Sequence, residues 1–469
     1  MPLTRFRLPP RRLRELRETL HLAVPLVLGQ LSAVGMNVVD AVLAGHLDAH
    51  TLGAVAVGTS IWSISIVVAI GVMMALPPSV AQLHGAGRNG EIGPLFRQAL
   101  WLALMLGSLL ALGTYWVGPF IVSHIGIDPP LVADVGHFLH AIAFGAPALA
   151  VFFALRGLGE GIGMPRPTLY FSLLGLVLLV PIGYALMYGA FGLPRLGAFG
   201  SGMATAIVLW LQASLFALYV WRSRHYQGLD AFAGFEWPDA RAIAGLLRIG
   251  VPMGVTLFME ASLFIGVALA IGTLGTDVIA GHQIAINVAS VAFMLPLGIA
   301  MATTVRVGHA VGAGDADRVR DAGAVGLVMT LATQTLTASI MFLAPALIAR
   351  LYTHDEAVIA VAVKLLMLAG LFQFSDGIQC VANGALRGLK DTRVPMLITL
   401  FAYWMVGLPV GWWLAFGHGQ GAPGLWVGLI AGLSVAAVLL TRRFRRLSRR
   451  PLSEFTHDSR AMPSHGGLG

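Results

Sequence analysis

Apolar stretches of about 20 residues recur from the N-terminal region to Leu440. An α-helix needs about this length to cross a hydrocarbon core about 30 Å thick. Of the 469 residues, 57% are hydrophobic and 11% are charged, whereas ordinary soluble domains are roughly 45–50% apolar and about 25% charged. These proportions exclude a soluble domain and predict an all-α polytopic membrane protein.

Hydrophobic runs bounded by proline, glycine and charged residues predict about twelve transmembrane helices in two homologous six-helix lobes. The predicted spans are 20–44, 54–76, 97–118, 132–154, 168–189, 200–221, 243–272, 279–301, 322–347, 357–382, 394–416 and 421–440. The predicted parts of the chain are a basic cytoplasmic segment over 1–19, an N-terminal lobe over 20–221, a cytoplasmic connection over 222–242, a C-terminal lobe over 243–440, and a basic, disordered cytoplasmic tail over 441–469.

The distribution of basic residues predicts the orientation. If the N-terminus is cytoplasmic, 27 of the 30 Lys and Arg residues fall on cytoplasmic segments. The other three, Arg195, Arg350 and Lys364, lie in or beside outer connections. The positive-inside rule therefore places both termini in the cytoplasm, with the helices in the inner membrane. The net charge of +8 is then a topology signal, and no nucleic-acid partner is expected.

Motifs of soluble enzymes are missing from the sequence. It contains no GxxxxGK[ST] phosphate loop, no HExxH, and no GxSxG within a predicted span. The single cysteine, Cys380, can form neither an internal disulfide nor a cysteine-rich zinc site. We expect neither an enzyme nor a cofactor, and an ion gradient is the more plausible energy source than ATP.

The second half of the chain repeats the first. Pairs that match at an offset of 227 are Pro25 with Pro252, Gly45 with Gly272, and 85–87 with 312–314. Farther on, ALRGL over 154–158 recurs over 385–389. Six helices return the chain to its starting side, so the two lobes should be related by an axis along the membrane normal, with the substrate path between them.

Three acidic residues, Asp40, Glu260 and Asp376, fall well inside predicted spans. Each costs roughly 2.5–3.5 kcal/mol at mid-membrane on insertion scales. No basic residue lies within one helical turn of any of them in the sequence. Such a carboxylate is a candidate site for a proton, a metal ion or a cationic substrate. The structural alternative is that each caps a helix break or pairs with a polar neighbour.

Polar side chains accompany these acids at helical spacing. The main companions are Gln373, Gln379 and Asn383 around Asp376, Thr256 one turn before Glu260, and His282, Gln283, Asn287 and Ser290 on the eighth span. Oxygen-bearing side chains beside Glu260 and Asp376 would suit Na⁺ or a shared proton. The amides could equally be interhelical hydrogen bonds worth about 0.6–2 kcal/mol each. In the first half, Asp40 stands alone among carboxylates, which favours a proton over a tightly bound metal.

Three segments carry a resemblance to a known family. They are VPLVLGQLSAVGMNVVDAVLAGHL from Val24, GHQIAINVASVAFMLPLGIAMATTVRVGHAVGAG from Gly281, and FQFSDGIQCVANGALRGLKDTRVPM from Phe372. Over nearly its whole length the sequence resembles the multidrug and toxic compound extrusion (MATE) family, and most closely its NorM-type bacterial branch. The resemblance implies two lobes around a central cavity and antiport of lipophilic, often cationic compounds against Na⁺ or H⁺. It also implies cation-linked carboxylates at Glu260 and Asp376, with Asp40 as the acid of the N-terminal lobe.

The fifth span departs from that family pattern. Leu179 and Gly183 flank Pro181 where such proteins often carry two asparagines. Thr205 remains a candidate companion of Asp40. The missing asparagines favour the C-terminal pair, Glu260 and Asp376, as the site of cation coupling. The candidate cavity walls, where methionine and aromatic side chains would contact flat organic cations, are Met253, Met259, Phe293 and Met294. The expected partners are small organic cations and membrane lipid, and the chain is expected to be a monomer.

Other functions fit the sequence less well. A flippase for lipids or lipid-linked sugars would be expected to line its cavity with arginines that bind phosphate, whereas the cavity candidates here are acidic. An ion channel would need its acids at equivalent positions of the two halves, but Val267 is the counterpart of Asp40. An intramembrane enzyme would need a nucleophile and a base, and the sequence shows no such pair.

The topology is directly testable. A cytoplasmic reporter fused after Arg450 should be active, and one inserted over 190–199 should report the outer side, because the basic residues select that orientation. Finding the C-terminus outside, or the 190–199 connection inside, would contradict the assignment.

Overall fold

The structure is a computed structural model, and it describes residues 10–124, 129–452 and 455. Within these residues it consists of helices and connecting turns, with no strand. The predicted segments over 1–9 and 456–469 lie outside them. The prediction of an all-α membrane protein is confirmed.

The helices follow one another with short breaks. Up to Gly272 they are α1 (Pro10–Leu47), α2 (Ala49–Met73), α3 (Leu76–Gly85), η1 (Asn89–Glu91), α4 (Ile92–Leu112), η2 (Gly113–Val117), α5 (Gly118–His124), α6 (Pro129–Ala143), α7 (Ala146–Gly161), α8 (Arg166–Tyr188), η3 (Ala190–Gly192), α9 (Gly197–Arg222), η4 (Arg224–Leu229) and α10 (Ala240–Gly272). The others are α11 (Thr276–Gly312), α12 (Ala316–Leu343), α13 (Pro345–Arg350), α14 (Glu356–Gly388), α15 (Arg393–Leu400), η5 (Phe401–Gly407), α16 (Leu408–Trp412), η6 (Trp413–Gly417) and α17 (Ala422–Leu447).

Eleven helical stretches are long and apolar enough to cross a membrane. A twelfth arises if α6 and α7, which meet at a bend of 44°, together form one span. Pro147 lies in the first turn of α7, and its ring and missing N–H prevent a straight continuation from α6. The count of about twelve spans agrees with the sequence.

The helices run past the predicted membrane boundaries at both ends of the chain. α1 begins at Pro10, so residues 10–19 of the predicted basic segment are helical. α17 ends at Leu447, so residues 441–447 of the predicted tail are helical too. Hydrophobicity marks only the part of a helix that lies in lipid, and these arginine-rich turns carry no such signal.

Two compact units make up the chain. The C-terminal unit comprises Met1–Val27 and Val255–Gly469, and the N-terminal unit comprises Leu28–Gly254. The sequence predicts lobes over 20–221 and 243–440, and these bounds differ from those of the two units. In the structure, one boundary between the units falls inside α1 and the other falls inside α10, the first helices of the two repeats. The two boundaries are 227 residues apart, which is the offset of the repeat.

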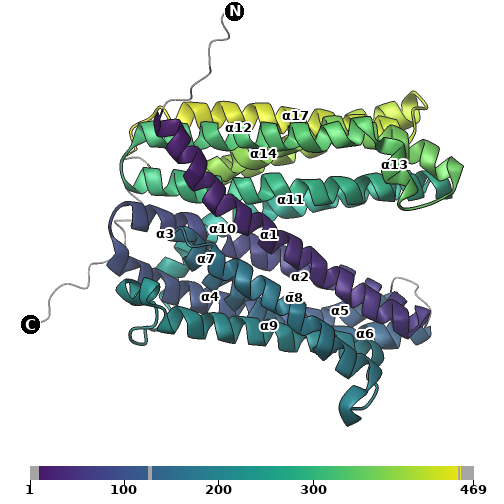
Figure 1. Cartoon of the computed structure of the whole chain (residues 1–469), viewed down its shortest axis with the longest axis horizontal. Helices are drawn as coiled ribbons and strands as arrows, with labels where there is room; N and C mark the ends of the chain where they lie inside the picture. Colours follow the sequence, from purple (N-terminus) through teal and green to yellow (C-terminus); the bar gives the residue numbers. More distant parts are fainter. Residues whose placement is uncertain (1–9, 125–128, 453–454, 456–469) are drawn as a thin grey trace, which may run out of the picture. The chain divides into compact units, whose positions relative to one another are not determined.

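α14 is the central helix of the C-terminal unit. It packs against α11, α12 and α17, and Figure 1 shows these helices running side by side. A Cβ built at Gly384 of α14 would lie 2.5 Å from the carbonyl oxygen of Ala300 in α11. Glycine therefore permits the close approach of the two helices.

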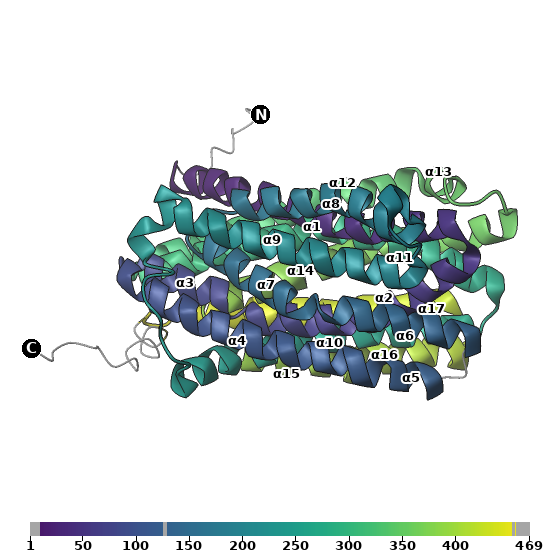
Figure 2. The same cartoon turned by 90° about the horizontal axis from the view of Figure 1, so that it is seen from below.

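In the N-terminal unit, α9 packs against α6, α7 and α8, and α4 packs against α7 (Figure 2). The largest fully buried side chains here include Phe96, Phe138 and Phe216. Phe216 of α9 stacks on Phe171 of α8 with ring centroids 4.7 Å apart. Aromatic packing thus contributes to the contacts between these helices.

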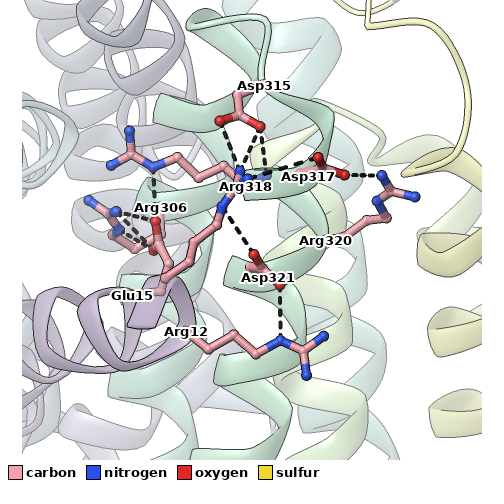
Figure 3. Close-up of polar contacts among 9 residues, drawn as sticks. Arg12, Glu15, Arg306, Asp315, Asp317, Arg318, Arg320 and Asp321 are labelled. Carbon is pink, nitrogen blue, oxygen red and sulfur yellow. Dashed lines mark hydrogen bonds and ion pairs between the residues drawn. The ribbon is translucent and has the colours of Figure 1, made fainter. Parts of the chain in front are cut away.

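Charged side chains fix the first turns of α1 to the C-terminal unit. We call them the N-terminal charge cluster, which consists of Arg11, Arg12, Glu15, Glu18, Arg306, Asp315, Asp317, Arg318, Arg320 and Asp321. Figure 3 shows α1 meeting the end of α11 and the start of α12 at the labelled members of this cluster. Glu15 accepts hydrogen bonds from Arg306 at 2.7 and 2.8 Å and from Arg318 at 2.8 Å. Each of these charges is therefore compensated by at least one charge of opposite sign within the cluster.

Asp315 begins α12 within this cluster. Its carboxylate accepts the backbone N–H of Arg318 at 2.9 Å and a hydrogen bond from Arg11 at 2.8 Å. These bonds hold the pKa of Asp315 below its ordinary value, the backbone bond most strongly. The contribution of Asp315 to stability is therefore complete above the ordinary aspartate pKa and is lost as the pH falls through the lowered one.

Replacing Glu15 tests how much the cluster stabilises the fold. Glu15 and Arg306 are buried, and removal of one member of a buried ion pair costs roughly 3–5 kcal/mol because the other charge is left without compensation. Glu15→Gln should therefore lower the melting temperature in detergent by several degrees. Asp317→Asn is the matched control, because its pair with Arg320 is solvent-exposed and such pairs contribute about 0–1 kcal/mol. Equal losses from the two variants would contradict this account.

Candidate functional site

Two intramembrane carboxylates of the C-terminal unit share one amide. Gln379 Nε2 donates to Glu260 Oε1 at 3.4 Å and to Asp376 Oδ1 at 3.4 Å. Asp376 and Gln379 are one turn apart on α14, and Glu260 reaches them from α10. The two acids are 116 residues apart in sequence, and the packing of the two helices brings them to one place.

These carboxylates lie in a poorly solvated position. Asp376 is 3% exposed, Gln379 is 2% exposed, and Glu260 is partly buried. No ion pair to either carboxylate occurs among the described residues. Two negative charges near each other in a medium of low polarity attract a proton or a cation.

The other polar residues predicted for this site have different surroundings. Asn383 lies one turn after Gln379 on the buried face of α14. Gln283 and Asn287, by contrast, are exposed, and Gln283 Nε2 donates to Asn287 Oδ1 at 3.4 Å. Hydrogen bonds between these two amides and the carboxylates do not occur in the described chain. The placement of Gln283 and Asn287 therefore gives no direct support for a role as ligands of the acidic pair.

Gln373 and His282 pack in the interior of the unit. Gln373 Nε2 donates to the carbonyl oxygen of Ala289, and its Oε1 accepts from Gln334. His282 Nδ1 accepts a hydrogen bond of 3.2 Å from the indole N–H of Trp426, which leaves the ring proton of the neutral imidazole on Nε2. Both side chains join helices, as the interhelical alternative predicts.

In the N-terminal unit, Asp40 receives two hydroxyl groups from α9. Ser201 Oγ donates to Asp40 Oδ1 at 3.3 Å, and Thr205 Oγ1 donates to Oδ2 at 3.1 Å. The structure thus places Thr205, the candidate companion, next to Asp40. Ser201, one turn earlier on α9, was not singled out from the sequence, although GSGMATAI contains both hydroxyls at helical spacing.

The four candidate cavity residues do not share one unit. Met253 belongs to the N-terminal unit and is 3% exposed. Met259, Phe293 and Met294 belong to the C-terminal unit and are partly exposed. The latter three remain candidates for contact with a substrate on the surface of their own unit.

Two further residues near the acidic pair were missed as site residues. Arg387, near the end of α14, is 5% exposed, and it follows Gln379, which donates to Glu260, by about two helical turns. Tyr403, in the π-helical segment η5, is fully buried, and its hydroxyl makes no hydrogen bond among the described residues. No basic residue lies within one turn of Glu260 in the sequence, and Arg387 belongs to a different helix, α14, so spacing along α10 could not point to it.

The donor set suits a hard monovalent cation or a proton better than a transition metal. The described residues contain no group of three or more His, Cys, Asp and Glu side chains that could hold a metal ion. Na⁺ prefers oxygen ligands, which the carboxylates of Glu260 and Asp376 supply. The amide of Gln379 could add an oxygen by turning over, since amide orientation follows the hydrogen-bond network.

Comparison with known proteins adds a family relationship to this geometry. The MatE family model matches residues 25–185 and again 252–413. A protein named "Probable multidrug resistance protein NorM" from Xanthomonas axonopodis pv. citri is 52% identical over 436 residues, covering 93% of this chain and 95% of its own. "Multidrug resistance protein PmpM" from Pseudomonas aeruginosa is 44% identical over 440 residues, covering 93% and 92%. The two family matches correspond to the internal repeat.

Solved structures share the fold at low sequence identity. The chain matches the eukaryotic MATE transporter AtDTX14 with a TM-score of 0.84 and 22% identity, covering 95% of this chain and 100% of that one. It also matches a transporter of the MOP superfamily from Pyrococcus furiosus, with a TM-score of 0.84 and 17% identity over 94% and 97% of the two chains. The chain therefore shares the fold of these transporters.

The shared amide can be tested by substitution. Gln379→Leu removes the group that joins the two carboxylates, so the concentration of coupling cation needed for half-maximal transport should rise about tenfold, the effect of about 1.4 kcal/mol of lost binding. Gln283→Leu is the matched control, because that amide bonds only to Asn287 among the contacts above. A similar change in both variants would show that the amide bridge has no special role.

Proposed function

Because the chain belongs to the MatE family, we propose that it is a multidrug efflux antiporter that exports lipophilic, often cationic compounds from the cytoplasm across the inner membrane in exchange for Na⁺ or H⁺. The observation that carries the proposal is the pair Glu260 and Asp376, which Gln379 joins inside the helices of the C-terminal unit. Members of this family are transporters and not enzymes.

The acidic pair provides a simple means of exchange. Repulsion between the two carboxylates favours uptake of a positive charge, and a proton, Na⁺ or the ammonium group of a drug can supply it. Each of these neutralises the same region, so binding one ligand weakens binding of another. Competition for one negative region couples the inward movement of the ion to the outward movement of the drug.

Two arginines in the interior of the helical units argue against a phosphate-binding flippase. Arg306 is paired with Glu15, and Arg156 is paired with Glu160 at 2.5 Å. A cavity for lipid phosphate would instead present arginines free to form bidentate bonds with the phosphate oxygens. The names of the two relatives, which refer to multidrug resistance, also favour export of small compounds.

Transport in reconstituted vesicles tests the proposal. The purified protein should move a fluorescent organic cation when a Na⁺ gradient or a pH gradient is imposed separately, and the effective gradient identifies the coupling ion. Glu260→Gln and Asp376→Asn keep the side-chain size and remove the charge, so both should insert and fold yet lose gradient-driven transport. Asp40→Asn should have a milder effect, because Asp40 has no second carboxylate beside it.

Two outcomes would contradict the assignment. If the Glu260 and Asp376 variants keep normal coupling and the Asp40 variant loses it, the ion route belongs to the N-terminal unit. If the wild-type protein in the vesicles moves no organic cation under either gradient but does move a fluorescent phospholipid, the flippase alternative is correct.

A further inference from the structure

Arg387 is a buried cation without the partners that its counterpart in the other repeat has. Its Nε and Nη1 atoms are buried and make no hydrogen bond among the described residues. An arginine is effectively always charged, and a charge removed from water needs compensation. Some nearby anionic group therefore has to supply that compensation.

The repeat shows how the same arginine is compensated in the N-terminal unit. Arg156 occupies the equivalent place in ALRGL. Its Nε donates to Glu160 at 2.5 Å, one turn later on α7, and its Nη1 donates to Gln30 of α1 at 3.0 Å. Glu160 is 3% exposed. Arg156 and Glu160 therefore neutralise each other inside the N-terminal unit.

Neither partner is available to Arg387. The equivalent of Glu160 is Asp391, which accepts hydrogen bonds from Arg443 at 2.5 and 3.1 Å. The equivalent of Gln30 on α10 is Leu257, which cannot accept a hydrogen bond through its side chain. One turn after Leu257 the same helix carries Glu260, whose equivalent on α1 is Ala33. The carboxylate near Arg387 is thus the one at the candidate coupling site.

We propose that Arg387 is the internal counter-charge of the Glu260 and Asp376 pair, and that it restricts the site to one positive charge at a time. This inference rests on the proposed function and specifies the class of cargo. With both carboxylates ionised and Arg387 charged, the group carries a net charge of −1. A single proton, Na⁺ or monovalent drug cation neutralises it, whereas a doubly charged cation leaves an excess positive charge in a medium that opposes it.

The remaining titratable groups near Arg387 do not change this count. Cys380 follows Gln379 on α14 and Tyr403 lies in η5, and both side chains are buried. Thiols and phenols titrate ordinarily near pH 8.5 and 10, and both are neutral at pH 7. Arg387 is therefore the charged group that separates a site of net charge −1 from one of −2.

Binding of two related dyes tests the proposal. Ethidium carries one positive charge and propidium carries two, on the same flat ring system. In Arg387→Gln the preference for propidium over ethidium should rise about tenfold or more relative to the wild type, because the site then has two uncompensated carboxylates. Arg387→Lys should keep the wild-type preference. Arg156→Gln is the matched control, and it should leave the dye preference unchanged because Glu160 and Gln30 are its bonded partners.

A double-mutant cycle on the melting temperature keeps the proposal testable if one variant folds poorly. Glu260→Gln leaves Arg387 without compensation and should lower the melting temperature, and adding Arg387→Gln should restore several degrees of it. Additive losses, or an unchanged dye preference in a folded Arg387→Gln protein, would overturn the counter-charge role. Failure of the wild type to bind either dye would instead contradict the proposed function, and the cycle would then decide on Arg387 alone.

Discussion

The cost of removing a charge from water is the constraint on which the rest of this structure depends. Arg306 and Glu15 are both buried, and each compensates the other. Arg156 and Glu160 do the same inside the N-terminal unit. These pairs stabilise the helices without leaving a charge available to a ligand. The acidic pair of the C-terminal unit differs because two carboxylates stand against one more distant guanidinium, and in the proposed function this imbalance attracts a cation.

Much of the fold could be predicted from the sequence because each helix that crosses a membrane must itself be a long run of apolar residues. A span is about 20 apolar residues wherever it occurs, and the offset of 227 residues reveals the duplication directly. The helical turns over 10–19 were missed for a physical reason. Their stability comes from pairing with α11 and α12, and no periodicity within the segment itself shows which distant charges it will meet.

The site was predictable only in part. Asp40, Glu260 and Asp376 stand out because acids are rare in spans, and Gln379 stands out because it is one turn from Asp376. Sequence spacing could not show that Gln283 and Asn287 would bond to each other. It also could not show that α10 would bring Glu260 near Arg387, since that proximity depends on how two helices pack rather than on positions along one helix.

Duplication supplied two similar scaffolds, and divergence of their charges made them unequal. Both repeats contain the arginine of ALRGL, so each repeat needs an anionic group that compensates a buried guanidinium. In the first repeat Glu160, on the same helix as Arg156, is that group. In the second repeat the equivalent aspartate bonds to Arg443 instead, so Arg387 depends on the carboxylate of the proposed coupling site. In the proposed exchange this carboxylate divides its attraction between Arg387, which is fixed, and a proton, Na⁺ or drug cation, which is exchanged. Such a shared charge binds its external partner weakly enough to release it at every turnover.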